Sequence, residues 1–286
     1  MSNMQPTYKR QRFLLAFLQQ IAEGVSSTDL QKLVFLYSMN HGASFYEFIP
    51  YKFGAYSFQL AEDVEILNRG GYLVVGDRGV QAVNEAPKNT LFQISQDRGK
   101  SLLRKAYRQY PYYAIRSQLL KRLFSAEEMN LFTAERLKYE KNAQTLFTIG
   151  YEGRSIEAFI NVLIQNGVKV LCDIRKNPLS RKIGFSKIKL KHITEAVGIK
   201  YLHIPELGIE SRKRSTLETP EDYKALFAAY AETLPELLPW LKELYLLLSS
   251  NLRVALMCYE KEALMCHRHV VRDYLINSYA VSSRDL

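Results

Sequence analysis

The sequence predicts two folded parts: a mainly helical first part and an α/β second part with a parallel sheet flanked by helices. At 286 residues the chain is long for one core, and domain sizes favour two units. Apolar residues recur at helical spacing in the first half, whereas short apolar runs alternate with helical segments in the second. The short runs of the second half are mostly apolar, as in strands covered on both faces. We place the boundary near residue 143, giving domains of residues 1–143 and 144–286.

Charge, hydropathy and cysteine content predict the kind of partner and the cellular location of the protein. The formal net charge is +10, which favours a polyanionic partner, so we expect nucleic acid, with DNA favoured over RNA. No run approaches the roughly 20 apolar residues of a membrane span, and the first residues lack the apolar core of a secretion signal. Three cysteines, an odd number, predict reduced thiols rather than a disulfide framework. We therefore expect a cytoplasmic protein without a membrane partner.

Helical spacing in the first part predicts helices over 13–22, 28–39 and 57–68, with a short β excursion at 48–54. Apolar runs at 72–75 and 90–94 flank a turn region and predict a β-hairpin. Helices followed by a hairpin are typical of a winged-helix-like module. The alternative is an ordinary helical domain that packs against its neighbour.

Several short motifs of the first part resemble Panacea, a family of small helical antitoxin-like domains that also occur fused to other domains. The motifs are Leu30-Gln31-Lys32-Leu33, Tyr46-Glu47-Phe48, Tyr51-Lys52-Phe53-Gly54 and Gly70-Gly71-Tyr72-Leu73. The resemblance spans about half of this part and implies a helical partner-binding or nucleic-acid-binding domain.

Residues 98–122 combine eight lysines and arginines with four tyrosines and contain no acidic residue. Basic side chains neutralise phosphates and tyrosine rings stack on bases, so this mixture predicts a nucleic-acid-binding surface. The alternative is a solvated helix face with the tyrosines packed inward. The candidate binding residues are Arg104, Lys105, Arg108, Tyr110, Tyr112, Tyr113, Arg116, Lys121 and Arg122.

In the second part, strands are predicted at 146–149, 168–174, 201–204 and 252–258. Helices are predicted at 155–165, 187–197, within 221–249, and from Cys266 onward. Each strand ends in polar residues. Because the carboxyl ends of parallel strands meet at one edge of a sheet, we expect these residues to converge there.

The same strand ends resemble DUF488, a bacterial and archaeal family of uncharacterised function. The motifs are Thr148 to Gly153, Asp173-Ile174-Arg175 with Pro178 and Ser180-Arg181, Tyr201 to Gly208, and Cys258-Tyr259-Glu260 with Cys266-His267-Arg268. The resemblance covers about residues 145–280. It implies an α/β fold with a polar pocket and a loose association with nucleic-acid modification or defence genes.

Reactive side chains at the strand ends define the candidate site. Cys266, at a predicted helix start, is the candidate nucleophile with His267 as its partner. The carboxylates of Asp173, Glu152 and Glu260 are candidate general acids or bases. The candidate substrate-binding residues are Tyr151, Arg154, Arg175, Arg181, His203, Glu206, Cys258 and Arg268. Structural alternatives are an ion-pair network that holds the loops and thiols that only pack, as we expect for Cys172.

A zinc site formed by Cys258, Cys266 and His267 with His203 is a rival interpretation, but the seven-residue gap between the cysteines lacks the tight spacing of structural zinc sites. The sequence also lacks a glycine-rich phosphate-binding loop, which argues against a nucleotide cofactor. We therefore expect neither a metal nor a cofactor. The resulting hypothesis is an enzyme performing a hydrolytic or group-transfer step on a base, nucleotide or glycosidic bond of nucleic acid. One alternative is a DNA-binding or antitoxin-like regulator whose α/β domain senses a ligand, and another is a thiol redox switch.

Overall fold

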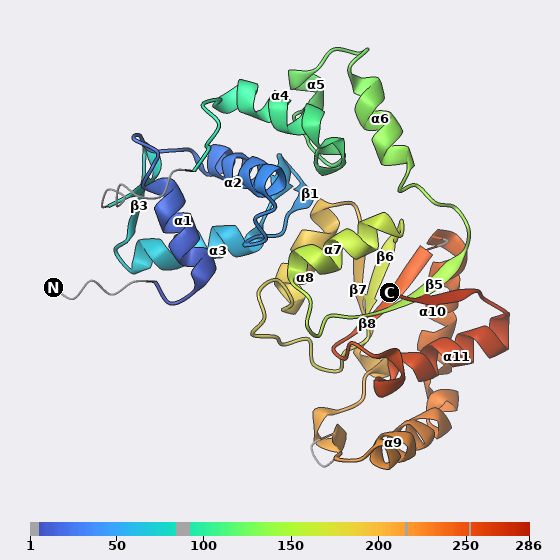
Figure 1. Cartoon of the computed structure of the whole chain (residues 1–286). Helices are drawn as coiled ribbons and strands as arrows, with labels where there is room; N and C mark the ends of the chain where they lie inside the picture. Colours follow the sequence, from blue (N-terminus) through green and yellow to red (C-terminus); the bar gives the residue numbers. More distant parts are fainter. Residues whose placement is uncertain (1–5, 84–91, 215–216, 252) are drawn as a thin grey trace. The chain divides into compact units, whose positions relative to one another are not determined.

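The computed structural model describes residues 6–83, 92–214, 217–251 and 253–286 and divides the chain into two compact units, Met1–Leu137 and Lys138–Leu286 (Figure 1). The boundary expected near residue 143 falls in the segment between the last helix of the first unit and the first strand of the second. Within the described ranges, none of the helices combines the length and apolar character of a membrane span.

Over its described residues, the first unit is mainly helical and carries two antiparallel hairpins. Its helices are α1 (Lys9–Leu18), α2 (Ser27–His41), α3 (Phe58–Arg69), α4 (Gly99–Gln109), the 3-10 turn η1 (Pro111–Ala114), α5 (Leu120–Leu123) and α6 (Met129–Leu137). The hairpins are β1 (Ile49–Tyr51) with β2 (Gly54–Tyr56), and β3 (Leu73–Gly76) with β4 (Gly79–Ala82).

The second hairpin corrects one prediction. β3 pairs with residues 79–82 rather than with the run expected at 90–94. Gly79 has a φ of +90°, which lets the chain reverse directly after β3. Residues 90 and 91 lie outside the described part, and residues 92–94 form no strand. The winged-helix interpretation therefore stays a prediction.

Residues that carry the Panacea resemblance form buried hydrogen bonds inside the first unit. The Gln31 amide donates to the Ser57 carbonyl at 3.0 Å and accepts from the Ser57 N–H at 2.8 Å, as a neighbouring strand would. The Lys32 ammonium donates to the Ala55 carbonyl at 2.8 Å. Burial lowers the pKa of Lys32 to about 7, partly offset by Asp29. These side chains fasten α2 to the β2–α3 segment.

The second unit is an α/β domain with a parallel sheet, as predicted, and its sheet has five strands where four were expected. Its strands are β5 (Thr145–Gly150), β6 (Val170–Asp173), β7 (Lys200–His203), β8 (Arg253–Cys258) and β9 (Ser283–Asp285), in the spatial order β7-β6-β8-β5-β9. The sequence did not predict β9, because its three polar residues are exposed and carry no apolar pattern. Its backbone nonetheless pairs with β5.

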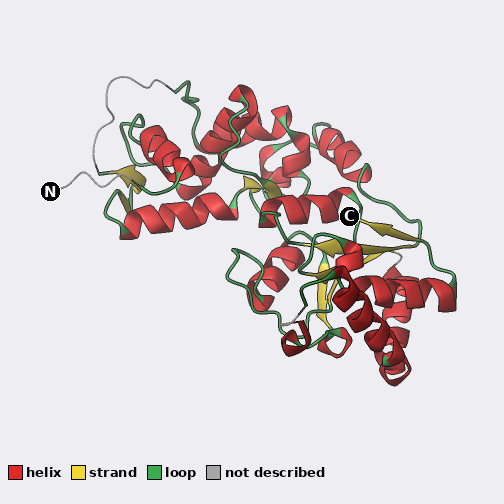
Figure 2. Cartoon of the chain, turned by 60° about the horizontal axis from the view of Figure 1, so that its bottom comes forward, coloured by secondary structure: helices red, strands yellow, loops and turns green. Residues whose placement is uncertain are grey.

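Helices cover both faces of this sheet (Figures 1 and 2). They are α7 (Ile156–Gln165), α8 (Lys187–Ala196), α9 (Pro220–Glu232), α10 (Leu238–Asn251) and α11 (Arg268–Tyr279), with 3-10 turns η2 (Pro205–Leu207), η3 (Ser211–Arg214), η4 (Leu234–Leu237) and η5 (Ala263–Met265). Helices α9, α10 and α11 share one core with β6 and β8, and α7 and α8 lie on the other side in Figure 1. The helical stretch expected over 221–249 is broken at η4, which contains Pro235, and resumes in α10, whose first turn contains Pro239; neither proline has the N–H that a continuous helix needs.

Strand register brings the predicted strand ends to one edge. Asp173 on β6 lies opposite His203 on β7 and Met257 on β8, and Gly150 on β5 lies opposite Cys258. β8 therefore ends between β5 and β6, in the middle of the carboxyl edge where open α/β folds bind ligands.

Candidate functional site

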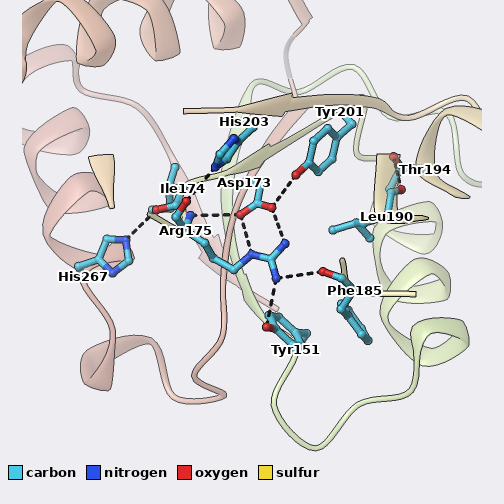
Figure 3. Close-up of polar contacts among 10 residues, drawn as sticks. All are labelled: Tyr151, Asp173, Ile174, Arg175, Phe185, Leu190, Thr194, Tyr201, His203 and His267. Carbon is cyan, nitrogen blue, oxygen red and sulfur yellow. Dashed lines mark hydrogen bonds and ion pairs between the residues drawn. The ribbon is translucent and has the colours of Figure 1, made fainter. Parts of the chain in front are cut away.

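A buried ion-pair network occupies the end of β6 (Figure 3). The Arg175 guanidinium donates to both Asp173 oxygens, from Nε at 2.8 Å and from Nη2 at 2.5 Å. Tyr201 donates its hydroxyl to Asp173 Oδ2 at 2.6 Å, and the Arg175 N–H donates to Oδ1 at 3.1 Å. The remaining Arg175 nitrogen donates to the Tyr151 hydroxyl and the Phe185 carbonyl, both at 3.1 Å. Asp173 is fully buried and its oxygens are occupied.

Burial and the Asp173 charge shift the pKa values of Tyr201 and Arg175 in this network. Burial and the Asp173 carboxylate both raise the pKa of Tyr201. For Arg175, burial opposes the charged form, but the hydrogen bonds and charge of Asp173 outweigh it and the pKa is raised. The Tyr151 ring stacks on Phe185 with centroids 4.3 Å apart. Asp173 and Arg175, predicted as a general base and a phosphate ligand, thus have the contacts of a loop anchor.

This anchor fixes two carbonyl groups that hold histidines. His267 Nε2 donates to the Ile174 carbonyl at 3.1 Å, and His203 Nε2 donates to the Arg175 carbonyl at 2.9 Å. A carbonyl oxygen only accepts, so each Nε2 carries a hydrogen. In its neutral form His267 therefore presents an unprotonated Nδ1.

That Nδ1 faces two sulfur atoms. It lies 3.9 Å from Cys258 Sγ and 3.8 Å from Cys266 Sγ, and the three atoms are all within 4.8 Å of one another. We call Cys258, Cys266 and His267 the sulfur–imidazole cluster. All three side chains are buried, with exposed fractions of 3%, 0% and 1%. His203, included in the sequence-based zinc set, is not part of the cluster.

Electrostatics favour a thiolate at Cys266. Burial acts to raise the pKa of this thiol, but hydrogen bonds with Cys258 and His267 and the positive charge of His267 and Arg268 lower it well below its ordinary value. The sequence predicted that Cys266 opens the helix, and this is wrong. Helix α11 begins at Arg268, and the backbone of Cys266 is extended, with φ −141° and ψ 138°. The neighbouring side chains, rather than a place in the first helical turn, account for the shift.

Arg268 holds the loop that follows β8. Its Nε donates to Thr148 Oγ1 at 3.2 Å, its Nη2 donates to the Lys261 carbonyl at 2.8 Å, and its Nη1 donates to the Glu260 carbonyl. Glu152 accepts from the Lys261 N–H at 2.9 Å. These contacts tie the ends of β5 and β8 together through Arg268 and Glu152, whose predicted roles toward a substrate stay predictions.

The other predicted site residues are spread along the same edge. The Cys258 thiol donates to half-buried Glu260 at 3.4 Å. Arg154 is half-buried, Glu206 is half-buried on η2, and Arg181 is exposed. The loop and helix after Arg175 expose further basic side chains, and we call residues 176–191 the basic segment. Its exposed members are Lys176, Arg181, Lys187, Lys189 and Lys191.

Many of the nucleic-acid-binding candidates of the first unit have partners inside that unit. Arg104 and Arg108 both pair with Glu128, and Lys105 pairs with Asp97 at 2.9 Å. Tyr110 donates to Asn40, and the ring of Tyr113 packs edge-on against Phe35 and Tyr112. Arg116 is half-buried, whereas Lys121 and Arg122 are exposed. These contacts give no direct support to a nucleic-acid surface there.

The sequence analysis did not predict two features next to the cluster, the ring of Tyr230 and a cavity. Tyr230 on α9 places its ring edge-on to His267, with centroids 5.8 Å apart, and donates to the Leu207 carbonyl at 2.7 Å. Between α9, η5 and α11 lies a mostly apolar cavity of about 650 Å³. Met265 and His269, which flank the cluster in sequence, line it. A tyrosine in an amphipathic helix gives no sequence signal of such a contact.

Comparison with known families agrees with this geometry. Residues 155–275 match the family model described as Domain of unknown function DUF488. The match lies within the second unit and supports the DUF488 resemblance of that unit. Searches of curated proteins and of solved structures gave no match. The match does not cover the Panacea resemblance of the first unit, which stays a prediction.

Proposed function

We propose that the chain is an enzyme that performs a hydrolytic or group-transfer step on nucleic acid or a nucleotide, with the sulfur–imidazole cluster as its reactive centre. The observation that carries the proposal is that Cys258, at the end of β8, and Cys266 with His267, before α11, bring two sulfurs and a nitrogen within 4.8 Å of one another. This happens at the sheet edge where α/β folds place their sites. Packing alone does not require three such groups to face one another.

The basic segment supports a phosphate-bearing substrate. It begins two residues after Ile174, whose carbonyl holds His267, so the cluster and the basic residues are fixed to the same strand end. Lys182 donates to the Tyr151 carbonyl at 3.0 Å, which pins the loop, while five basic side chains of the segment stay exposed. Exposed cations on this anchored loop and on the start of α8 suit the binding of phosphates.

For the first unit we propose recognition of the polyanion or of a protein partner. The β3–β4 hairpin supports a wing-like role, because Val74 and Val75 on it are exposed by 57% and 43%. Lys121 and Arg122 are exposed and add positive charge to the surface of this unit. A role in nucleic-acid modification or defence follows from this proposal and from the DUF488 resemblance.

Turnover tests the proposal directly. The full chain would be incubated with single- and double-stranded DNA and RNA oligonucleotides and with free nucleotides, and products would be identified by mass spectrometry. We expect a product with the wild type and with Cys172→Ala, which changes a buried cysteine outside the cluster, and its loss in Cys266→Ser and His267→Ala. Equal turnover in all four proteins, or none on any of these substrates, would refute the proposal.

A ligand-sensing regulator is the second candidate, and the apolar cavity beside α11 favours it. A cavity of this size and character suits a small organic ligand. In that case the chain would bind DNA with an affinity that changes with the ligand, and the cluster variants would leave DNA binding unchanged. Titration of labelled DNA with wild type and Cys266→Ser distinguishes the two candidates.

A further inference from the structure

The sulfur–imidazole cluster has the donor atoms and spacing of a metal centre. In a tetrahedral zinc site with Zn–S near 2.3 Å and Zn–N near 2.0–2.1 Å, a sulfur and a nitrogen ligand lie about 3.6 Å apart. The distances from His267 Nδ1 to Cys258 Sγ and Cys266 Sγ are 3.9 and 3.8 Å. These two distances need to change by only a few tenths of an ångström, while the two sulfurs, which lie within 4.8 Å of each other, would settle about 3.8 Å apart around the ion.

The imidazole is held as a metal-binding histidine is held. Its Nε2–H donates to the Ile174 carbonyl at 3.1 Å, which directs the lone pair of the neutral Nδ1 at the two sulfurs. A backbone carbonyl on the far nitrogen is the usual second contact of a histidine ligand, because it fixes both tautomer and ring orientation. This contact is independent of the sulfur positions and points to the same ligand atom.

Hydrogen-bonded backbone positions all three donors. Cys258 ends the central strand β8, and Cys266 and His267 lie between η5 and α11. The N–H of Cys266 donates to the Ala263 carbonyl at 3.1 Å, and the His267 carbonyl accepts from Val270 at 3.1 Å. Because the backbone on both sides of the cluster is fixed, a cation would meet a preformed set of donors.

We propose that Cys258, Cys266 and His267 bind one soft or borderline divalent cation, with zinc as the ion that best fits two thiolates and one imidazole. Two thiolates, a neutral imidazole and a divalent cation have no net charge, which suits a buried site. Three protein ligands leave one coordination position, the pattern of catalytic rather than structural zinc sites. The role assigned here to the reactive centre rests on the proposed function, whereas binding of the ion does not.

Cobalt(II) is the probe that reports the ligands without any need for turnover. Full-length protein, freed of metal by a chelator, would be titrated with cobalt(II), and the sulfur-to-cobalt charge-transfer absorption and the visible bands of a tetrahedral ion would be recorded. We expect saturation at one ion per chain, displacement by zinc, and one zinc per chain by elemental analysis after reconstitution.

Variants identify the donors. Cys258→Ser, Cys266→Ser and His267→Ala should each weaken or abolish the charge-transfer absorption, whereas Cys172→Ala should leave it intact because Cys172 lies inside β6, away from the cluster. Glu260→Gln should also retain the ion, because three donors come from the cluster. Circular dichroism of every variant checks that the fold is retained. For a cluster variant that unfolds, zinc protection of wild-type thiols from alkylation provides the same test.

The outcomes separate this inference from the proposed function. Absence of cobalt binding in folded wild-type protein, or equal binding by Cys172→Ala and Cys266→Ser, would overturn the metal site. If turnover without metal were then lost in Cys266→Ser, the proposed function would stand with the thiolate itself as the reacting group. One bound ion without turnover on any substrate would instead confirm the metal site and refute the enzyme.

Discussion

Asp173→Asn is predicted to destabilise the second unit strongly, because Asp173 is the counter-ion of a buried guanidinium. Its carboxylate accepts from Arg175 Nε, Nη2 and N–H and from the Tyr201 hydroxyl, at distances between 2.5 and 3.1 Å. Neutralising one partner of a buried pair leaves an uncompensated charge and costs about 3–5 kcal/mol. For a unit of this size, each kcal/mol lowers the melting temperature by about 2–4 °C, so the expected loss is about 6–20 °C.

The chain offers a convenient reporter for this experiment. Its single tryptophan, Trp240, lies in α10 and packs against the core of the second unit, so its fluorescence follows the unfolding of that unit. Asp273→Asn is the matched control. Asp273 pairs with Arg272 on the surface with 47% of its side chain exposed, and its loss should cost no more than about 1 kcal/mol.

A second substitution isolates the cause. If the cost comes from the unpaired charge of Arg175, adding Arg175→Met to Asp173→Asn should recover part of the lost stability, and the double-mutant cycle should give a clear coupling energy. An Asp173→Asn protein that unfolds within about 1 kcal/mol of wild type, or a double variant whose losses simply add, would refute the account of Asp173 as a loop anchor.

Three further predictions concern other parts of the chain. Burial lowers the pKa of Lys32 from 10.5 to about 7, so the unfolded chain binds more protons between these values and the free energy of unfolding should rise with pH across this window. Lys32→Met should flatten that part of the urea-denaturation profile, and parallel profiles would contradict the reasoning. Gly150→Ala should destabilise the protein more than Gly153→Ala, because the new Cβ at position 150 would lie 1.8 Å from the Glu260 carbonyl oxygen. Gly153 has a φ of +74° and faces open space, so alanine there costs only the backbone strain of about 1–2 kcal/mol. Equal melting temperatures for the two variants would show that the close approach at Gly150 does not matter. If the basic segment binds phosphates, Lys187→Glu with Lys189→Glu should weaken double-stranded DNA binding and make its salt dependence shallower by about 0.9 for each phosphate that is no longer neutralised; an unchanged slope in fluorescence anisotropy would rule out that surface.

The sequence predicted most of the second unit because its strands carry strong local signals. The apolar runs that became β5, β6 and β8 are buried on both faces, and the turns between them contain glycine. Alternation of strands and helices then required a parallel sheet with its carboxyl ends together. Two features were missed for different reasons: β9 is short and polar and gave no local signal, whereas Pro235 and Pro239 did signal the break between α9 and α10, but the helical spacing of the residues around them outweighed it in the prediction.

Roles within the site were harder to predict than its position. Asp173 and Arg175 are two residues apart, so on an extended chain their side chains share one side and can pair, a signal that the sequence did contain. The approach of Cys266 to Cys258 was only an alternative in the sequence analysis, because no local spacing predicts it. It depends on η5 turning the chain back toward β8, and the seven-residue gap argued against a shared site. Tertiary contacts, not spacing, bring these donors together.

Anomalous diffraction at the zinc absorption edge, from crystals of the full chain grown with zinc, tests the central claim most directly. We predict one strong peak within about 2.0–2.3 Å of Cys258 Sγ, Cys266 Sγ and His267 Nδ1, with the Ile174 carbonyl still on His267 Nε2. Crystals in which these three donor atoms lie apart, or in which zinc binds elsewhere and leaves them empty, would contradict the claim that they form one centre.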